Sequence, residues 1–345
     1  MQAIGLDIGG AHLKLAGLSG PDTVDWVFQL PCPLWKGLDQ LADAWRKACA
    51  NITIHAGSQC AVTMTGELAD CFTSRNDGVW QIMDCLKGLL EKPFWVYAGD
   101  RGLLDPEAAR SLPELVASAN WHASACCVAE YYSAGLFIDI GTTTTDIIPF
   151  NDGVPQHHAY DDHRRMACRE LIYSGVVRTP VMALLQSVQL DGRAAPLVAE
   201  HFATMADVYR LTGDLPPYCD QYPSSDLAPA TRTASARRLA RMVAMDFNDD
   251  EEFWVRMAEQ IARWHHQTLL AACLHLRRRE HLDDQAPLVA AGVGRFMARR
   301  IAQDIGSPYH SYSDLLLSSA DHRWLSDCAS AVSVARLLYR AQQAS

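Results

Sequence analysis

Apolar and polar positions at the start of the chain predict three consecutive strands. Residues 4–8 form an apolar run, residues 13–18 continue it after a glycine turn, and residues 23–30 follow a Gly-Pro-Asp turn signal at 20–22. Short apolar runs separated by such turns are typical of an antiparallel meander. We therefore expect the chain to open with a small sheet.

Helical spacing takes over next. Apolar residues recur three and four positions apart over 36–50, which predicts an amphipathic helix. Residues 59–64 and 94–98 are short apolar runs that predict buried strands, and a second helix is expected between them, near 80–90. The first part of the chain is therefore α/β rather than all-β.

The opening pattern recurs in the middle of the chain. Residues 4–15 and 136–147 both contain an apolar strand, an Asp-Ile-Gly triplet and a second apolar strand, and Asp7 aligns with Asp139. Two such segments in matching context, about one domain apart, imply two copies of one structural unit.

The second copy is expected to continue with strands at 145–150 and 154–160, and then with a mostly helical stretch. Residues 287–301 predict a strand, a glycine turn and a helix. A last helix carries an apolar stripe between residues 325 and 339, which we interpret as core-facing.

The length favours about two domains. The predicted fold class is α/β, with two duplicated lobes and a ligand cleft between them. The first lobe is expected at 1–132 and the second at 133–345, the latter with a helical insertion at about 197–279 and a C-terminal helix.

Composition places the chain among globular proteins, with 49% apolar and 20% charged residues. The start has no basic segment followed by a long apolar run, and nowhere do 18 apolar residues run together, so we expect a cytoplasmic protein without a membrane partner. Eleven cysteines without a C-x-x-C pair are expected to be reduced core residues.

A net charge of −10 argues against nucleic acid as a partner. An anionic small-molecule substrate must then be held by local devices: backbone N–H groups, a metal ion, or a few Lys and Arg side chains.

The two Asp-Ile-Gly turns suit phosphate binding. Glycine lets the backbone approach an anion closely, and successive N–H groups form a nest. Gly9, Gly10 and Gly141 are the phosphate candidates on the backbone. Asp7 and Asp139 are candidates for holding a hydrated Mg²⁺, because carboxylate oxygen is the ligand that this cation prefers.

Hydroxyl groups make the second turn the more specific of the two. Thr142 and Thr143 are the first candidates for phosphate contact, followed by Thr144 and Thr145. Alternation along a strand sends one of each neighbouring pair away from the ligand. The alternative is that these β-branched residues merely suit a strand.

Lys14 and Asp146 occupy equivalent positions in the two copies and are both catalytic candidates. Lys14 sits within an apolar strand, where an ammonium needs phosphate or a carboxylate as partner. A snorkelling surface lysine is the alternative.

Two carboxylates follow the strand predicted at 59–64. Thr65 is expected to cap a helix that would place Glu67 and Asp70 on one face. They are candidates for a metal ligand or a general base, because α/β proteins place their sites at the carboxyl ends of strands. The alternative is that they complement the helix dipole.

Residues 161–180 are rich in charged side chains. Arg165 and Arg178 are candidates for gripping a terminal phosphate. The equally weighted alternative is two internal ion pairs, between Asp162 and Arg165 and between Glu170 and Arg178. The histidines at 157–158 lack metal-ligand spacing and are expected to be ordinary strand or loop residues.

With its two Asp-Ile-Gly turns, the sequence resembles the actin-like ATPase superfamily, whose members include sugar kinases and actin. The resemblance implies that two such hairpins face each other across a cleft and that a later glycine turn holds a nucleoside. Gly292 and Gly294 stand where that turn is expected. The alternative is an ordinary strand-to-helix turn.

A narrower resemblance rests on six ordered segments, residues 5–14, 63–72, 119–123, 138–149, 170–175 and 204–209. They resemble the hydantoinase/oxoprolinase-related proteins of the tetrahydromethanopterin-linked one-carbon pathway. That group is similar to the archaeal methanofuran synthase that joins an aminomethylfuran-methyl diphosphate to γ-glutamyltyramine.

The resemblance implies a transferase of methanofuran-type cofactor biosynthesis, in which a tyramine- or tyrosine-based phenol displaces diphosphate. It implies Mg²⁺ as cofactor, and ATP is compatible but not required. Asn120 and Glu170 join the two late glycines as nucleotide- or substrate-binding candidates. The partners are then the diphosphate substrate and the phenolic acceptor, and a homo-oligomer is left open. The rivals are a small-molecule kinase and a nucleotide-dependent switch.

Overall fold

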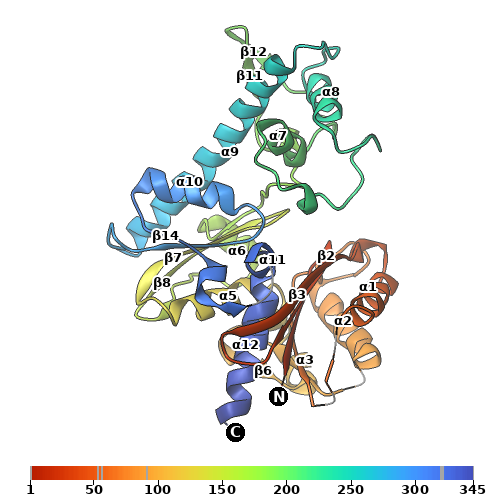
Figure 1. Cartoon of the computed structure of the whole chain (residues 1–345), viewed down its shortest axis with the longest axis vertical. Coiled ribbons are helices and arrows are strands. Elements are labelled where there is room, and N and C mark those ends of the chain that lie inside the picture. The colour runs from red at the N-terminus through yellow and green to blue at the C-terminus, as the bar shows by residue number, and fades with distance from the viewer. Residues whose placement is uncertain (1, 53, 56, 91, 319–321, 345) are drawn as a thin grey trace. The chain divides into compact units, whose positions relative to one another are not determined.

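The computed structural model divides into two compact units, which we describe separately (Figure 1). It describes residues 2–52, 54–55, 57–90, 92–318 and 322–344. The first unit comprises Met1–Gly135, Ile148–Cys168 and His310–Ser345, and the second comprises Leu136–Ile147 and Arg169–Tyr309. The lobes expected from the repeat, 1–132 and 133–345, follow the chain without such interleaving, and they stay a prediction.

A seven-stranded sheet forms the centre of the first unit. Its order is β15-β3-β2-β1-β4-β5-β6, with β1 antiparallel to β2 and parallel to β4. The strands are β1 (Ala3–Ile8), β2 (His12–Leu18), β3 (Thr23–Pro31), β4 (Gln59–Met64), β5 (Phe94–Tyr97), β6 (Leu103–Leu104) and β15 (Leu317–Ser318). The predicted opening meander is confirmed, and so are the strands expected near 59–64 and 94–98.

Alternation along β1 separates the two faces of this sheet. Ile4, Leu6 and Ile8 enter the core cluster formed with α1 (Asp39–Cys49) and α2 (Arg75–Leu89). The opposite face packs against α12 (Ala329–Ala344) and α5 (Asn120–Ala129), as Figure 1 shows.

Gly5 allows α12 to approach this face closely. A Cβ at this position would lie 1.8 Å from the carbonyl oxygen of Ala331. We expect Gly5→Ala to lower the free energy of unfolding by about 3 kcal/mol, because overpacking of this kind forces backbone shifts. Urea denaturation measures the effect. Gly88→Ala is the matched control, because no described atom lies within 4 Å of its Cβ position; an equal loss in that variant would contradict the packing argument.

The sheet of the second copy has the order β10-β8-β7-β13-β14, with β9 also paired to β8. This is the order of β3-β2-β1-β4-β5, and β13 runs parallel to β7 as β4 does to β1. The strands are β7 (Ala134–Ile140), β8 (Thr145–Asn151), β9 (Val154–Pro155), β10 (Leu171–Ile172), β13 (Leu288–Ala291) and β14 (Tyr309–Ser311). The duplication is thus confirmed, and the chain has the actin-like α/β fold.

The third strand predicted at 154–160 is wrong beyond residue 155. Pro155 ends β9, and proline has no N–H group with which to continue a ladder. The N–H of Gln156 still donates to the carbonyl oxygen of Pro149 at 2.7 Å, but residues 156–160 form no strand.

Helices cover most of residues 197–279 in the second unit. Gly213, with φ of +82°, ends α7 in the left-handed conformation that glycine favours, and the Asp250 side chain caps α9. The last predicted helix is divided between α11 and α12. The remaining helices are α3 (Pro106–Arg110), α4 (Pro113–Val116), α6 (Asp162–Ala167), α7 (Met205–Thr212), α8 (Arg232–Met242), α9 (Glu251–Arg279), α10 (Arg295–Ile305) and α11 (His322–Asp327).

Short elements complete the description. The small sheet of the second unit pairs β11 (Ser187–Leu190) with β12 (Arg193–Pro196). The 3-10 helices are η1 (Leu34–Lys36), η2 (Gly99–Arg101), η3 (Val181–Ala183), η4 (Pro217–Cys219) and η5 (Tyr312–Leu315). Among the helices of the described ranges, none combines the length and the apolarity needed to cross a bilayer. The cysteines are free thiols, but Cys49 and Cys71 are exposed rather than in the core.

Candidate functional site

Asp7 is the centre of the candidate site in the first unit. It is the register partner of Lys14 on β2 and of Thr63 on β4, so the three side chains lie in a row on one face of the sheet. Its Oδ2 accepts hydrogen bonds from the Ser330 hydroxyl and, at 3.4 Å, from the Asn120 amide. The Lys14 ammonium lies 4.0 Å from the same oxygen.

The other carboxylate oxygen of Asp7 is buried and, among the described residues, has no hydrogen-bond partner. The hydroxyl of Thr63 is in the same condition. Buried polar atoms are normally satisfied, so an orphaned carboxylate oxygen indicates a place for a cation or an ordered water. Asp7 therefore has the donor chemistry for Mg²⁺.

Backbone hydrogen bonds hold the glycine turn of the first hairpin. The N–H of Gly9 donates to the carbonyl oxygen of His12 at 2.9 Å, and the carbonyl oxygen of Gly10 accepts from Leu34 at 3.1 Å. Within the described ranges, no atom lies within 4 Å of a Cβ built on Gly10. The outer surface of the turn thus has room for a ligand.

The helix predicted after Thr65 is wrong. The N–H groups of Thr65 and Gly66 both donate to the carbonyl oxygen of Ile8, which ties the chain to β1 as an irregular turn, and the next helix begins only at Arg75. Glu67 and Asp70 therefore do not share a helical face. Asp70 is exposed, whereas Glu67 is completely buried.

Glu67 anchors a polar network. Its Oε1 accepts from the Arg75 guanidinium at 3.0 Å and from the Ser118 hydroxyl at 2.8 Å, and Arg75 also contacts Asp162 at 3.2 Å. Burial raises the pKa of Glu67, while the contacts with Arg75 and Ser118 act in the opposite direction. Asp162 thus contacts Arg75, a partner that the sequence patterns did not indicate.

The raised pKa of Glu67 should make the free energy of unfolding depend on pH. A carboxyl with a raised folded-state pKa contributes stability that is fully present below the ordinary value of 4.5 and is lost as pH rises through the folded-state value. Glu67→Gln cannot titrate, so the stability of wild type relative to this variant should fall as pH rises above about 4.5. Urea denaturation from pH 4 to 8 measures it, and Asp70→Asn is the exposed control. A relative stability that rises with pH would contradict the direction assigned to Glu67.

The second hairpin repeats the construction of the first. The N–H of Gly141 donates to the carbonyl oxygen of Thr144 at 2.9 Å, and the carbonyl oxygen of Thr142 accepts from Arg178 at 2.8 Å. Gly175 permits this approach, because a Cβ there would lie 2.5 Å from atoms of the turn. The turn is therefore fixed by its carbonyl groups.

The threonines of this turn fall into two groups. Thr145 is buried and its hydroxyl donates to the carbonyl oxygen of Ser174 at 2.8 Å, so its role is structural. Thr142, Thr143 and Thr144 are half-buried and stay candidates for phosphate contact.

The late glycine turn lies against Asp139. Ala291 is the register partner of Asp139, and a Cβ on Gly292 would lie 2.3 Å from Asp139 Oδ1. The N–H of Gly294 donates to Ile140 at 2.8 Å, as Gly66 does to the equivalent residue of β1. This turn is both the start of α10 and a direct neighbour of the Asp139 carboxylate.

The remaining candidates have mixed surroundings. Arg165 is buried, with its guanidinium 4.0 Å from the centre of the Trp121 ring. Glu170 is buried and accepts from Arg279 at 2.8 Å. Asp146 is half-buried and is the register partner of Leu171 on β10. Whether the two arginines predicted to grip phosphate converge stays a prediction, since Arg165 and Arg178 belong to different units.

Sequence reasoning missed the partners supplied by distant segments. Ser330, Ser118 and Arg75 contact Asp7 or Glu67 from other elements. No local motif surrounds any of them in the sequence. Only the row of register partners carries a signal, because Thr63 and Asp7 both lie near the ends of predicted strands.

Comparison with known proteins gives relatives in two archaea. Over 209 residues the chain is 32% identical to a Methanocaldococcus jannaschii protein named (4-{4-[2-(gamma-L-glutamylamino)ethyl]phenoxymethyl}furan-2-yl)methanamine synthase, covering 60% of this chain and 61% of that one. A Methanococcus vannielii protein of the same name is 29% identical over 113 residues, 33% of this chain and 50% of its own. The chain therefore matches less than two thirds of the length of these relatives.

A solved structure supports the fold. The nucleotide-free structure of an acetone carboxylase matches with a TM-score of 0.57 at 9% identity, covering 97% of this chain and 70% of that one. The family model described as hydantoinase/oxoprolinase matches residues 59–314, which is most of the chain and includes the second hairpin and the late glycine turn. The chain belongs to the hydantoinase/oxoprolinase family.

Proposed function

We propose that the chain is a synthase of methanofuran-type cofactor biosynthesis that forms an aryl ether. The observation that carries the proposal is its 32% identity to a synthase whose name describes a phenoxymethyl-furan product. The substrates would be an aminomethylfuran-methyl diphosphate and a phenol of tyramine or tyrosine linked to glutamate.

The reaction exchanges one carbon–oxygen bond for another. The phenol oxygen bonds to the furfuryl carbon, the bond from that carbon to diphosphate breaks, and the phenol proton passes to a base. Diphosphate leaves with the bonding electron pair, so no oxidant or ATP is consumed. The main barrier is the charge that develops on the leaving group.

The hairpins supply groups suited to that charge. In the first unit these are the backbone N–H of Gly10 and the Lys14 ammonium, since the N–H of Gly9 already donates to His12, and in the second unit the hydroxyls of Thr142 and Thr143. The Lys14 ammonium lies 4.0 Å from a carboxylate oxygen of Asp7.

Asp7 in the first unit and Asp139 in the second each offer the oxygen donors that Mg²⁺ prefers. Among the described residues, Asp7 Oδ1 has no hydrogen-bond partner, and this supports the assignment of Asp7. When bound, the ion would supply neutralisation of diphosphate charge.

Two carboxylates are candidates for the base. A phenol has a pKa near 10, far above that of a carboxyl group, so a carboxylate cannot ionise the phenol in advance. It can accept the proton only while the leaving group departs. Glu67 has the raised pKa that suits a base but is completely buried, whereas Asp70 is exposed. Comparing the pH–rate profiles of Glu67→Gln and Asp70→Asn separates them, since only loss of the base removes the acid limb of the profile.

The direct test combines purified protein, the furan diphosphate, a phenolic acceptor and Mg²⁺. We expect the ether and diphosphate in equal amounts, identified by mass spectrometry, without ATP. Formation of ADP that depends on an acceptor would instead identify a small-molecule kinase and overturn the proposal.

A further inference from the structure

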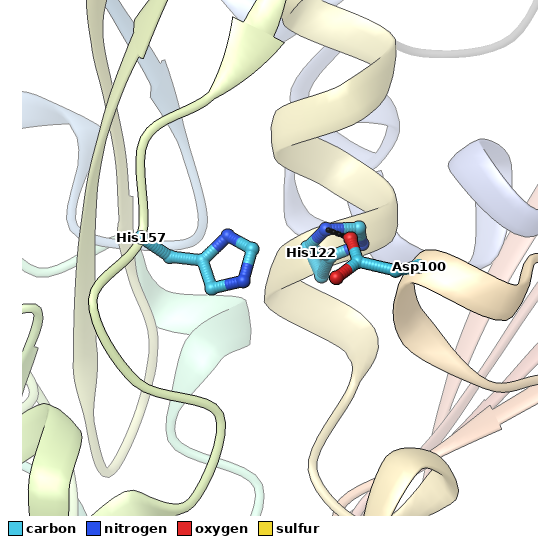
Figure 2. A group of neighbouring side chains, drawn as sticks. All are labelled: Asp100, His122 and His157. Carbon is cyan, nitrogen blue, oxygen red and sulfur yellow. Dashed lines mark ion pairs between the residues drawn. The ribbon is translucent and has the colours of Figure 1, made fainter.

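Three potential metal ligands meet in the first unit, apart from the hairpin residues. Asp100 comes from η2, His122 from α5 and His157 from the segment after β9, and Figure 2 shows their side chains directed toward one another. One ligand atom from each lies within 4.8 Å of the other two. Because the three positions are far apart in the sequence, no spacing motif indicates them.

His122 is already oriented for coordination. Its Nε2 lies 3.1 Å from a carboxylate oxygen of Asp100, and its Nδ1 lies 2.7 Å from the hydroxyl oxygen of Tyr97. Ligands bonded tetrahedrally at about 2.0–2.2 Å stand about 3.3–3.6 Å apart, so the 3.1 Å between His122 and Asp100 is close to the spacing of neighbouring ligands. The contact with Tyr97 is the outer hydrogen bond that metal-bound histidines normally make. It lets Nδ1 carry the proton and leaves the Nε2 lone pair for an ion.

Tyr160 contacts the other two ligands, His157 and Asp100. Tyr160 packs edge-to-face on His157, with ring centres 4.7 Å apart, and its hydroxyl accepts from the backbone N–H of Asp100 at 2.8 Å. A Cβ on Gly99, where φ is +52°, would lie 2.6 Å from the Tyr160 ring. The Tyr160 ring therefore requires glycine beside Asp100, and the cluster is preorganised.

Charge and donor type select the ion. Two neutral imidazoles and one carboxylate form a donor set typical of Zn²⁺ and related transition ions, whereas Mg²⁺ prefers oxygen alone. The Asp100 carboxylate offsets part of the ionic charge, and Arg165, stacked on Trp121, acts against it. Three protein ligands leave a fourth position for water or a substrate group.

We propose that Asp100, His122 and His157 bind a divalent transition ion, with Zn²⁺ as the expected occupant. The ion fastens the segment after β9 to α5 and η2. This segment continues into α6, whose Asp162 contacts Arg75 beside Glu67. Metal binding would thus steady one partner of the Glu67 network. The proposal does not depend on the ether-forming activity.

The test titrates the full-length, tag-free apoprotein with Co²⁺, followed by visible absorption, and then displaces Co²⁺ with Zn²⁺. We expect saturation at one equivalent and a tetrahedral Co²⁺ spectrum. His157→Ala and Asp100→Asn should each weaken Zn²⁺ binding at least 10-fold, and Tyr97→Phe about 10-fold. His158→Ala is the matched control, because this neighbouring histidine is exposed and outside the cluster.

Circular dichroism confirms that each variant is folded before its affinity is interpreted. Absence of saturable binding by folded wild type would overturn the proposal and leave His122, Asp100 and Tyr97 as a hydrogen-bonded relay. Equal affinity of His157→Ala and wild type, or an equal loss in His158→Ala, would overturn it as well.

Discussion

Asp139→Asn is expected to reduce ether formation by about 10²–10³-fold, the loss typical of removing one electrostatic contact to a developing charge. Asparagine keeps the size of aspartate, and position 139 is half-buried at the end of β7, so the fold should persist. The neutral amide cannot hold a hydrated Mg²⁺ with the strength of a carboxylate. The initial rate of diphosphate release, with ether measured by mass spectrometry, gives the effect.

A second readout separates the role of Asp139 from the identity of the substrate. Calorimetry with inorganic diphosphate should show Mg²⁺-dependent binding by wild type and at least 10-fold weaker binding by Asp139→Asn. Asp152→Asn is the control, because Asp152 is exposed in a β-turn with φ of +51°, a conformation that asparagine tolerates. Diphosphate binding at wild-type strength by Asp139→Asn would contradict the proposed role of Asp139 in holding Mg²⁺.

Local patterns predicted the parts of the fold that local physics determines. The strand at 59–64 was predicted with the bounds of β4, and the repeat predicted hairpins that close with equivalent hydrogen bonds at Gly9 and Gly141. An apolar run bounded by glycine turns has few alternatives once it must be buried. These features therefore needed no knowledge of distant partners.

Tertiary contacts overrode the local pattern after β4. Thr65 and Glu67 read as the start of a helix, but the carbonyl oxygen of Ile8 captures the N–H groups of Thr65 and Gly66. The first N–H groups of a helix have no partner within the helix. Here the sheet competes with a helix cap for these donors. The helix begins later, at Arg75, where the Ser74 side chain provides the cap.

The polar clusters could not be predicted for a different reason. Ser330 reaches Asp7, and His157 reaches His122, only because elements far apart in the sequence pack together. Serine and histidine are common on helices and loops, so neither carries a signal by itself. The sequence predicted the backbone of the candidate site and missed the side chains that complete it.

Gly292→Ala tests whether the late glycine turn positions the Asp139 carboxylate. A Cβ at this position would lie 2.3 Å from both Asp139 Oδ1 and the carbonyl oxygen of Ile140. The carboxylate must move by about 1 Å, and a displacement of that size costs about 10²-fold in rate. We expect that loss in ether formation, with Mg²⁺-dependent diphosphate binding weakened in parallel.

Backbone strain alone would give a different result, and Gly213→Ala isolates it. Gly213 has φ of +82°, close to the +80° of Gly292, but within the described ranges no atom lies within 4 Å of its Cβ position. Gly213→Ala should lose about 1 kcal/mol of stability, because alanine is unfavourable in the left-handed region. Gly292→Ala should lose more, because its Cβ also meets the carbonyl oxygen of Ile140. Only Gly292→Ala should also lose activity. If both variants kept wild-type rates at a temperature where each is folded, the close approach of Gly292 to Asp139 would have no catalytic role.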